Sequence, residues 1–139
     1  MSLGPKQELF ARLLPRLIDE AHRLGYAVRL KELQRGEQQA EWNSRHCCVC
    51  GDVRKGHGAA DHPFKPIGIE NSLHCDGLAI DLVLFSQGAP LWDTEVYRKL
   101  GEFWEKQHED CYWGGATAKI GDRLRHDGGH FSLTSEGRQ

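Results

Sequence analysis

A nearly continuous apolar segment from Leu78 to Phe85 is interrupted once, by Asp81. A run of this length and character is typical of a β-strand that is buried on both faces. A carboxylate inside such a strand is unfavourable unless a cation compensates its charge. The segment therefore predicts a central strand whose single acidic side chain has a positively charged partner.

His74 is the first candidate for sharing that partner with Asp81. It lies seven positions before Asp81, and a fully extended chain of this length would separate the two residues by roughly 23 Å. Ligands of one ion must lie within a few ångströms of each other, so the chain between them has to fold back. Gly77 can adopt the positive φ that such a turn needs, and we expect His74 and Asp81 to meet.

A second pair of metal-binding side chains, Asp127 and His130, follows near the end of the sequence. Gly128 and Gly129 separate them and make a regular helix improbable. We expect a tight turn that leads into a strand beginning near Phe131. Both side chains of the pair can then face one point.

These residues together predict a hydrolytic zinc site. Catalytic zinc commonly has three protein ligands and keeps a fourth position for water. We expect the ligands to be His74, Asp81 and His130. The remaining carboxylate, Asp127, is the candidate general base, and His126 is the nearest competitor for either role.

The rest of the sequence predicts a small α+β domain. Apolar residues from Leu9 to Leu24 recur at helical spacing, with Pro15 inside the pattern, so we expect a helix that is kinked or split at the proline. Strands are expected at 26–30 and 78–85, a helix from Asp93 or Thr94 to about His108, and short closing strands at 112–115 and 131–133. We predict a central, mainly antiparallel sheet flanked by helices.

Length and charge exclude several classes of protein. With 139 residues, 18 basic and 20 acidic side chains, the chain has the size of one domain and a formal charge of −2, which argues against nucleic acid as a partner. No stretch approaches the roughly 18 apolar residues of a membrane span, and the first residues lack the apolar core of a signal peptide. We therefore expect synthesis in the cytoplasm, no membrane insertion, and a monomer.

A loop at about residues 46–66 is rich in cysteine and histidine. Cys47 and Cys50 have the spacing of a zinc knuckle, and His57 and His62 follow with a four-residue gap. The six residues between Cys50 and His57 are fewer than in the usual zinc finger. A second, structural zinc and simple reduced thiols both remain open. A nucleic-acid-binding knuckle is a further reading, which the net charge disfavours.

Seven residues of the two predicted half-sites resemble the signature of the M15 family of zinc peptidases. This family contains D-alanyl-D-alanine carboxypeptidases and phage L-alanyl-D-glutamate endolysins, and its signature is Ser-x-His-x-x-Gly-x-Ala-x-Asp followed by an acid-x-x-His. The matching residues are Ser72, His74, Gly77, Ala79, Asp81, Asp127 and His130. An aspartate ahead of the last histidine is similar to the phage branch. The resemblance implies a Hedgehog/DD-peptidase-like fold, with residues 1–139 as one M15-like peptidase domain.

The resemblance also implies a substrate and residues that bind it. The substrate would be the peptidoglycan stem peptide, hydrolysed at a bond involving a D-residue, with Zn²⁺ as cofactor. The family's substrate arginine lies five residues before a glutamine, whereas Arg35 here lies four before Gln39. Arg35, Gln39 and Ser72 are the predicted substrate-binding residues. Such an endolysin of a bacteriophage would reach the cell wall or periplasm after release from the cytosol. The alternative is a non-catalytic, metal-stabilised binding module.

Overall fold

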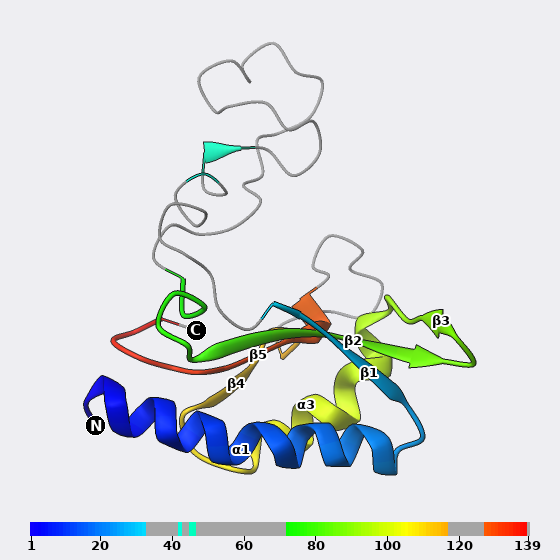
Figure 1. The fold of residues 1–139 in the computed structure, drawn as a ribbon, viewed down its shortest axis with the longest axis horizontal. Coiled ribbons are helices and arrows are strands. Elements are labelled where there is room, and N and C mark those ends of the chain that lie inside the picture. The colour runs from blue at the N-terminus through cyan, green and yellow to red at the C-terminus, as the bar shows by residue number, and fades with distance from the viewer. Residues whose placement is uncertain (33–41, 43–44, 47–71, 117–126, 139) are drawn as a thin grey trace.

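A computed structural model of the chain describes residues 1–32, 42, 45–46, 72–116 and 127–138, and only the backbone of Asp127. Over the described residues, the named elements are two α-helices, five strands and two 3₁₀ turns, arranged as Figure 1 shows. In chain order they are α1 (Leu3–Arg23), β1 (Ala27–Glu32), β2 (Ala79–Ser86), β3 (Ala89–Pro90), η2 (Thr94–Tyr97), α3 (Arg98–Glu105), β4 (Cys111–Trp113), η3 (Asp127–Gly129) and β5 (His130–Leu133).

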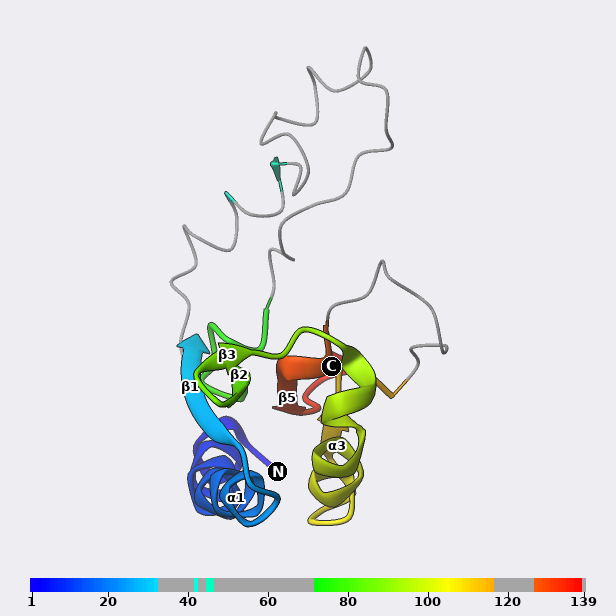
Figure 2. The same cartoon turned by 90° about the vertical axis from the view of Figure 1, so that its right-hand side faces the viewer.

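The strands form one antiparallel sheet in the order β1-β2-β5-β4, and the short β3 pairs with the end of β2. The predicted fold class, a small α+β domain with a mainly antiparallel sheet, is confirmed. Both helices lie on the same face of the sheet, as the two views together show (Figures 1 and 2). The described part of the chain is therefore a two-layer structure, with helices below and strands above.

The hydrophobic core fills the space between these two layers. The fully buried Trp104 of α3 makes edge-to-face contacts with Phe10 of α1 and Phe131 of β5, at centroid distances of 5.8 and 6.2 Å. Side chains alternate between the two faces of a strand. Because Phe131 faces the helices and pairs with Ile80 in β2, their neighbours Asp81 and His130 project from the opposite face. The predicted central strand is thus buried as expected, with its acid directed away from the core.

Two of the predicted elements differ in detail from the structure. Pro15 lies inside α1 without splitting it. Pro15 is exposed, so the carbonyl group that loses its hydrogen bond can be solvated. The predicted single helix after Asp93 begins as the 3₁₀ turn η2, where the Asp93 carboxylate accepts a hydrogen bond from the Glu95 backbone N–H at 3.0 Å. Tight 3₁₀ turns of this kind are common where a helix starts.

Candidate metal centre

The pairing of β2 with β5 brings Asp81 and His130 together. The two residues are direct partners in the antiparallel register, and directly opposed residues have Cβ atoms about 4.5–5.5 Å apart. His130 Nδ1 lies 3.1 Å from Asp81 Oδ1. Both side chains are partly open to solvent, with 19% and 27% of their surfaces exposed. Sheet register alone thus fixes two of the three predicted ligands.

His74 reaches the same point from a turn that precedes β2. The backbone N–H of Leu78 bonds to the Leu73 carbonyl and that of Gly77 to the His74 carbonyl. This pair of bonds, with Gly77 at φ 66°, is the Schellman arrangement that ends a helical turn. Leu73 and Leu78 are both buried, as the hydrophobic contact of that motif requires. Gly77 therefore allows the chain to fold back as predicted.

Ser72 caps the start of this turn. Its Oγ accepts a hydrogen bond from the His74 backbone N–H at 3.2 Å, as an N-cap serine does. The turn places His74 Nε2 3.4 Å from Asp81 Oδ2. The two imidazole rings lie 5.3 Å apart, centroid to centroid. All three predicted ligands are thus brought together, whereas Ser72 is buried and its role in substrate binding remains a prediction.

The turn η3 leads directly into His130 and holds the backbone before it. Trp113 Nε1 donates a hydrogen bond to the Gly128 carbonyl at 2.7 Å. A Cβ atom on Gly129 would lie 2.3 Å from the Leu82 carbonyl oxygen, so only glycine permits this close approach to β2. The backbone immediately before His130 is therefore held by β2 on one side and by Trp113 on the other.

The charge of Asp81 suits a metal ligand. Burial alone would raise the pKa of this carboxyl group, but hydrogen bonds from His130 and His74, and their positive charge when protonated, hold it well below its usual value. The carboxylate is consequently ionised at neutral pH. Metal ligands must be deprotonated to bind, so Asp81 is in the required state.

The three side chains fit a metal ion such as zinc. Their ligand atoms all lie within 4.8 Å of one another. Atoms bound at about 2.0 Å to one tetrahedral ion lie roughly 3.3 Å apart. Each carboxylate oxygen of Asp81 lies at a similar distance from one histidine, Oδ1 at 3.1 Å from His130 and Oδ2 at 3.4 Å from His74. Two imidazoles and one carboxylate form a donor set typical of zinc. The partial exposure of Asp81 and His130 leaves one side open for a further ligand.

Two buried polar atoms near this site have no hydrogen-bond partner among the described residues. They are His74 Nδ1 and Ser132 Oγ. Ser132 follows His130 by two residues in β5, so its side chain projects from the same face of the sheet. A histidine that binds metal through Nε2 carries a proton on Nδ1 and usually donates it to an outer-shell acceptor. The described residues supply no such acceptor for His74 Nδ1, so the assignment of His74 as a ligand rests on the position of its Nε2 atom near Asp81.

Several predicted site residues lie outside the described part of the chain. Asp127 begins η3, but its side chain is not described. The same holds for the whole of Arg35, Gln39 and His126, and for most of the predicted Cys/His loop, including Cys47, Cys50, His57 and His62. Their roles stay predictions. Within the described residues, no helix has the length and apolarity needed to span a membrane.

One supporting contact of the site, the hydrogen bond from Trp113 to the Gly128 carbonyl, had no signal in the sequence, because a tryptophan does not indicate a distant carbonyl group. The cap at Ser72 did carry a signal, since a serine followed five positions later by Gly77 is the pattern of a short capped helical turn.

The comparisons with known proteins support the fold. No family model matches the chain, and no curated protein matches it. A solved structure, the L-Ala D-Glu endopeptidase ChiX of Serratia marcescens, is similar with a TM-score of 0.53 and 23% sequence identity, over 87% of this chain and 77% of that one. The chain therefore has the α+β fold of this endopeptidase.

Proposed function

We propose that this chain is a zinc-dependent peptidase that hydrolyses a bond in the peptidoglycan stem peptide. The observation that carries the proposal is the convergence of His74, Asp81 and His130 within 4.8 Å on the face of the sheet opposite the helices. The fold supports it, because a structure of the same fold is an L-Ala D-Glu endopeptidase. The resemblance to the M15 signature supports it independently of the fold.

The metal ligands determine the chemistry that the site can perform. A zinc ion held by these residues would lower the pKa of a bound water molecule to about 7 and would polarise a substrate carbonyl group. Asp81 supplies the negative charge that holds the cation. The partly exposed Asp81 and His130 leave the site open on the side away from the helices, where a peptide can approach.

Asp127 is the proposed general base. It lies three residues before the ligand His130, at the first position of η3, and a carboxylate that does not bind the metal can accept the proton of the attacking water. Arg35, Gln39 and Ser72 are the proposed substrate-binding residues. We further propose that the enzyme is of the phage endolysin type and acts on the cell wall.

Mass spectrometry of digested peptidoglycan tests the proposal. Purified sacculi incubated with the zinc-loaded chain should release fragments with new amino termini. New termini at D-glutamate identify an L-alanyl-D-glutamate endopeptidase, and free D-alanine identifies a carboxypeptidase. If the wild-type chain binds zinc and yields neither product, the proposal is wrong and a metal-stabilised binding module is the better description.

A pair of variants tests the base. Asp127→Ala should keep zinc bound while product formation falls at least a hundredfold, the usual contribution of a general base. Glu109→Gln removes an exposed carboxylate after α3 and should cleave like the wild type. Unchanged cleavage by Asp127→Ala would remove Asp127 from the mechanism.

A further inference from the structure

The three metal ligands are not held equally well. Register between β2 and β5 fixes Asp81 and His130, whereas His74 lies on a turn outside the sheet. Within the described residues, the Nδ1 atom of its ring has no partner. Apart from the contact of Nε2 with Asp81, the position of the imidazole therefore depends on the backbone of the turn, and residues that hold the turn also help to hold the ligand.

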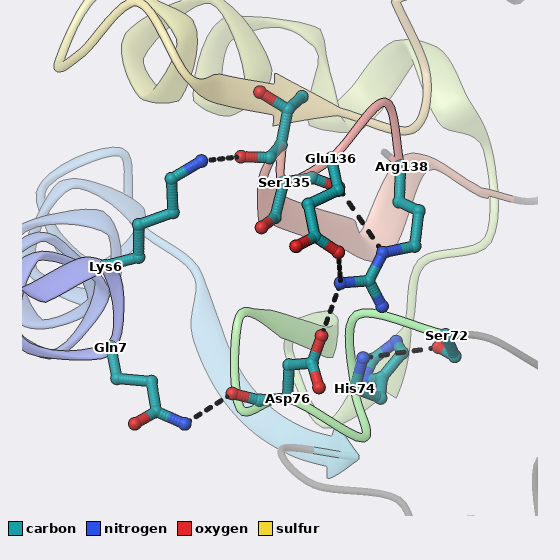
Figure 3. A network of polar contacts seen from close by, with 9 residues as sticks. Lys6, Gln7, Ser72, His74, Asp76, Ser135, Glu136 and Arg138 are labelled. Atoms are coloured by element: carbon teal, nitrogen blue, oxygen red, sulfur yellow. Dashed lines mark hydrogen bonds and ion pairs between the residues drawn. The ribbon is translucent and has the colours of Figure 1, made fainter. Parts of the chain in front are cut away.

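Asp76, two residues after His74, is the point at which distant segments hold this turn (Figure 3). Arg138 Nη2 lies 2.6 Å from Asp76 Oδ2. From α1, Gln7 Nε2 donates a hydrogen bond to the Asp76 backbone carbonyl at 2.7 Å. The turn is thus tied to the first helix by its backbone and to the C-terminal segment by its side chain.

Arg138 is itself directed toward the turn by a tight reversal of the chain. Ser135 and Arg138 exchange two backbone hydrogen bonds, of 3.1 and 2.9 Å, and both residues between them have positive φ. Arg138 Nε donates a further hydrogen bond to the Ser135 carbonyl at 3.3 Å. The tight reversal at Ser135 to Arg138 therefore orients the guanidinium group independently of its contact with Asp76.

α1 also anchors the segment that leads into this hairpin. Lys6 Nζ donates a hydrogen bond to the Thr134 carbonyl at 2.6 Å and lies 3.7 Å from Asp110. Lys6 and Gln7, adjacent in α1, thus contact the segment that leads to Arg138 and the backbone of Asp76, respectively. Figure 3 shows the two contacts on neighbouring residues of the helix.

We propose that Asp76 and Arg138 are positioning residues, whose ion pair keeps the turn closed so that His74 points at the metal. The inference deepens the proposed function, since it rests on His74 as a metal ligand. The pair is shielded from water, with 28% and 17% of the two side chains exposed, whereas Arg23 in the Arg23–Glu20 pair is 69% exposed. Shielded pairs are screened less than exposed ones. Arg23→Gln is consequently a matched control for Arg138→Gln.

Hydrogen exchange of the metal-free chain is the first test. The amides of Cys75, Asp76, Gly77 and Leu78 bond within the turn, so their exchange reports its opening. In Arg138→Gln these amides should exchange roughly three to ten times faster, while the amides of β2 exchange as in the wild type. Arg138→Lys keeps the charge and should restore most of the protection, and Arg23→Gln should leave the turn unchanged.

Zinc affinity, measured by competition with a chromophoric chelator, is the second test. Arg138→Gln should bind zinc roughly three to ten times more weakly, since residues outside the ligand shell tune metal affinity by up to about a hundredfold. The absorption spectrum of the cobalt-substituted chain should change with it, because it reports ligand geometry. Arg138→Lys and Arg23→Gln should bind zinc nearly as the wild type does.

The outcomes separate this inference from the proposed function. Unchanged exchange of the turn amides in Arg138→Gln overturns the inference, whether or not the chain is a peptidase. An equal loss of zinc affinity in Arg23→Gln also overturns it, since the effect would then be a general loss of stability. A wild-type chain that binds zinc but does not cleave peptidoglycan overturns the proposed function and leaves the positioning role of Arg138 intact.

Discussion

The two faces of the sheet differ although the same strands build them. The face toward α1 and α3 packs apolar side chains around Trp104 and Phe131, so its stability comes mainly from burial. The opposite face carries Asp81 and His130, one residue along each strand from that core. Because side chains alternate between the faces, adjacent residues of one strand serve different purposes: one packs in the core and the next belongs to the candidate metal site. Changes on the helix face should therefore unfold the chain, and changes on the site face should spare the fold and abolish metal binding.

Trp104→Ala should cause the largest loss of stability, because it disrupts the packing on the helix side of the sheet. The ring is fully buried between Phe10 and Phe131, and its Nε1 donates a hydrogen bond to the Ser132 carbonyl at 3.0 Å. Its removal should lower the free energy of unfolding by about 3–5 kcal/mol, measured by urea denaturation. Trp92→Ala, at a position 62% exposed, is the matched control and should change it by less than about 0.5 kcal/mol.

Asp81→Asn should separate the two faces most clearly. Zinc at a hundred times its dissociation constant stabilises a wild-type chain by about 2.7 kcal/mol, which chelation by EDTA should reverse. The asparagine variant should lose this zinc-dependent stabilisation in thermal unfolding. Asp19→Asn changes an exposed carboxylate of α1 and should respond to zinc like the wild type. An undiminished zinc response in Asp81→Asn would contradict the assignment of this ligand.

Gly129→Ala tests the close approach of the backbone before His130 to β2. The added methyl group would collide with the Leu82 carbonyl, so β5 must shift against β2. We expect a loss of about 1–3 kcal/mol in unfolding free energy, together with weaker zinc binding. Gly4→Ala places the same methyl group in α1 where nothing lies within 4 Å, and should stabilise the chain by about 0.5–1 kcal/mol. Equal effects of the two substitutions would contradict the close approach.

Cys111→Ala should give the smallest effect at neutral pH, because it removes a single buried sulfur atom from β4. Burial, reinforced by the negative charges of Asp110 and Glu105, raises the pKa of Cys111 to about 12 against one opposing backbone hydrogen bond. Because a thiol has a pKa of about 8.5 when unfolded, the stability gained from the neutral thiol is complete below that pH and is lost as the pH rises toward 12. Unfolding free energies of the wild type and Cys111→Ala should converge over this range.

Alkylation supplies a second measurement on the same residue. A short pulse of iodoacetamide at pH 8, followed by peptide mass spectrometry, should label the half-buried Cys75 before the buried Cys111. Thiolates are the reacting species, so a raised pKa slows the reaction. Labelling of Cys111 at the rate of Cys75 would show that β4 opens readily.

Local patterns predicted much of this structure from the sequence. The apolar run gave β2, helical spacing gave α1, and the charge conflict at Asp81 together with Gly77 gave the meeting of His74 with Asp81. Each of these follows from neighbouring residues, because hydrophobic periodicity and turn chemistry act within a few positions. The meeting of His130 with Asp81 depends on the pairing of two strands whose residues are 49 positions apart. In the sequence, only the assumption that both residues bind the same ion connected them.

The supporting contacts had no comparable signal. Trp113 was one of four tryptophans, and its bond to Gly128 depends on how β4, η3 and α3 pack. Arg138 meets Asp76 across 62 positions, and a charged pair at that separation is one of many combinations that a sequence allows. Long-range polar contacts depend on the assembled backbone, so they can be read only after the fold is known.

The direct pairing of Asp81 with His130 has a consequence for folding errors. If β5 slipped by one residue along β2, His130 would turn into the apolar layer and Phe131 would turn out toward Asp81. Such a misaligned sheet has no pair of ligands at this point, so zinc would bind only the correctly aligned chain. Zinc binding would thus stabilise the native strand register selectively, and refolding with zinc should increase the fraction of chains in that register.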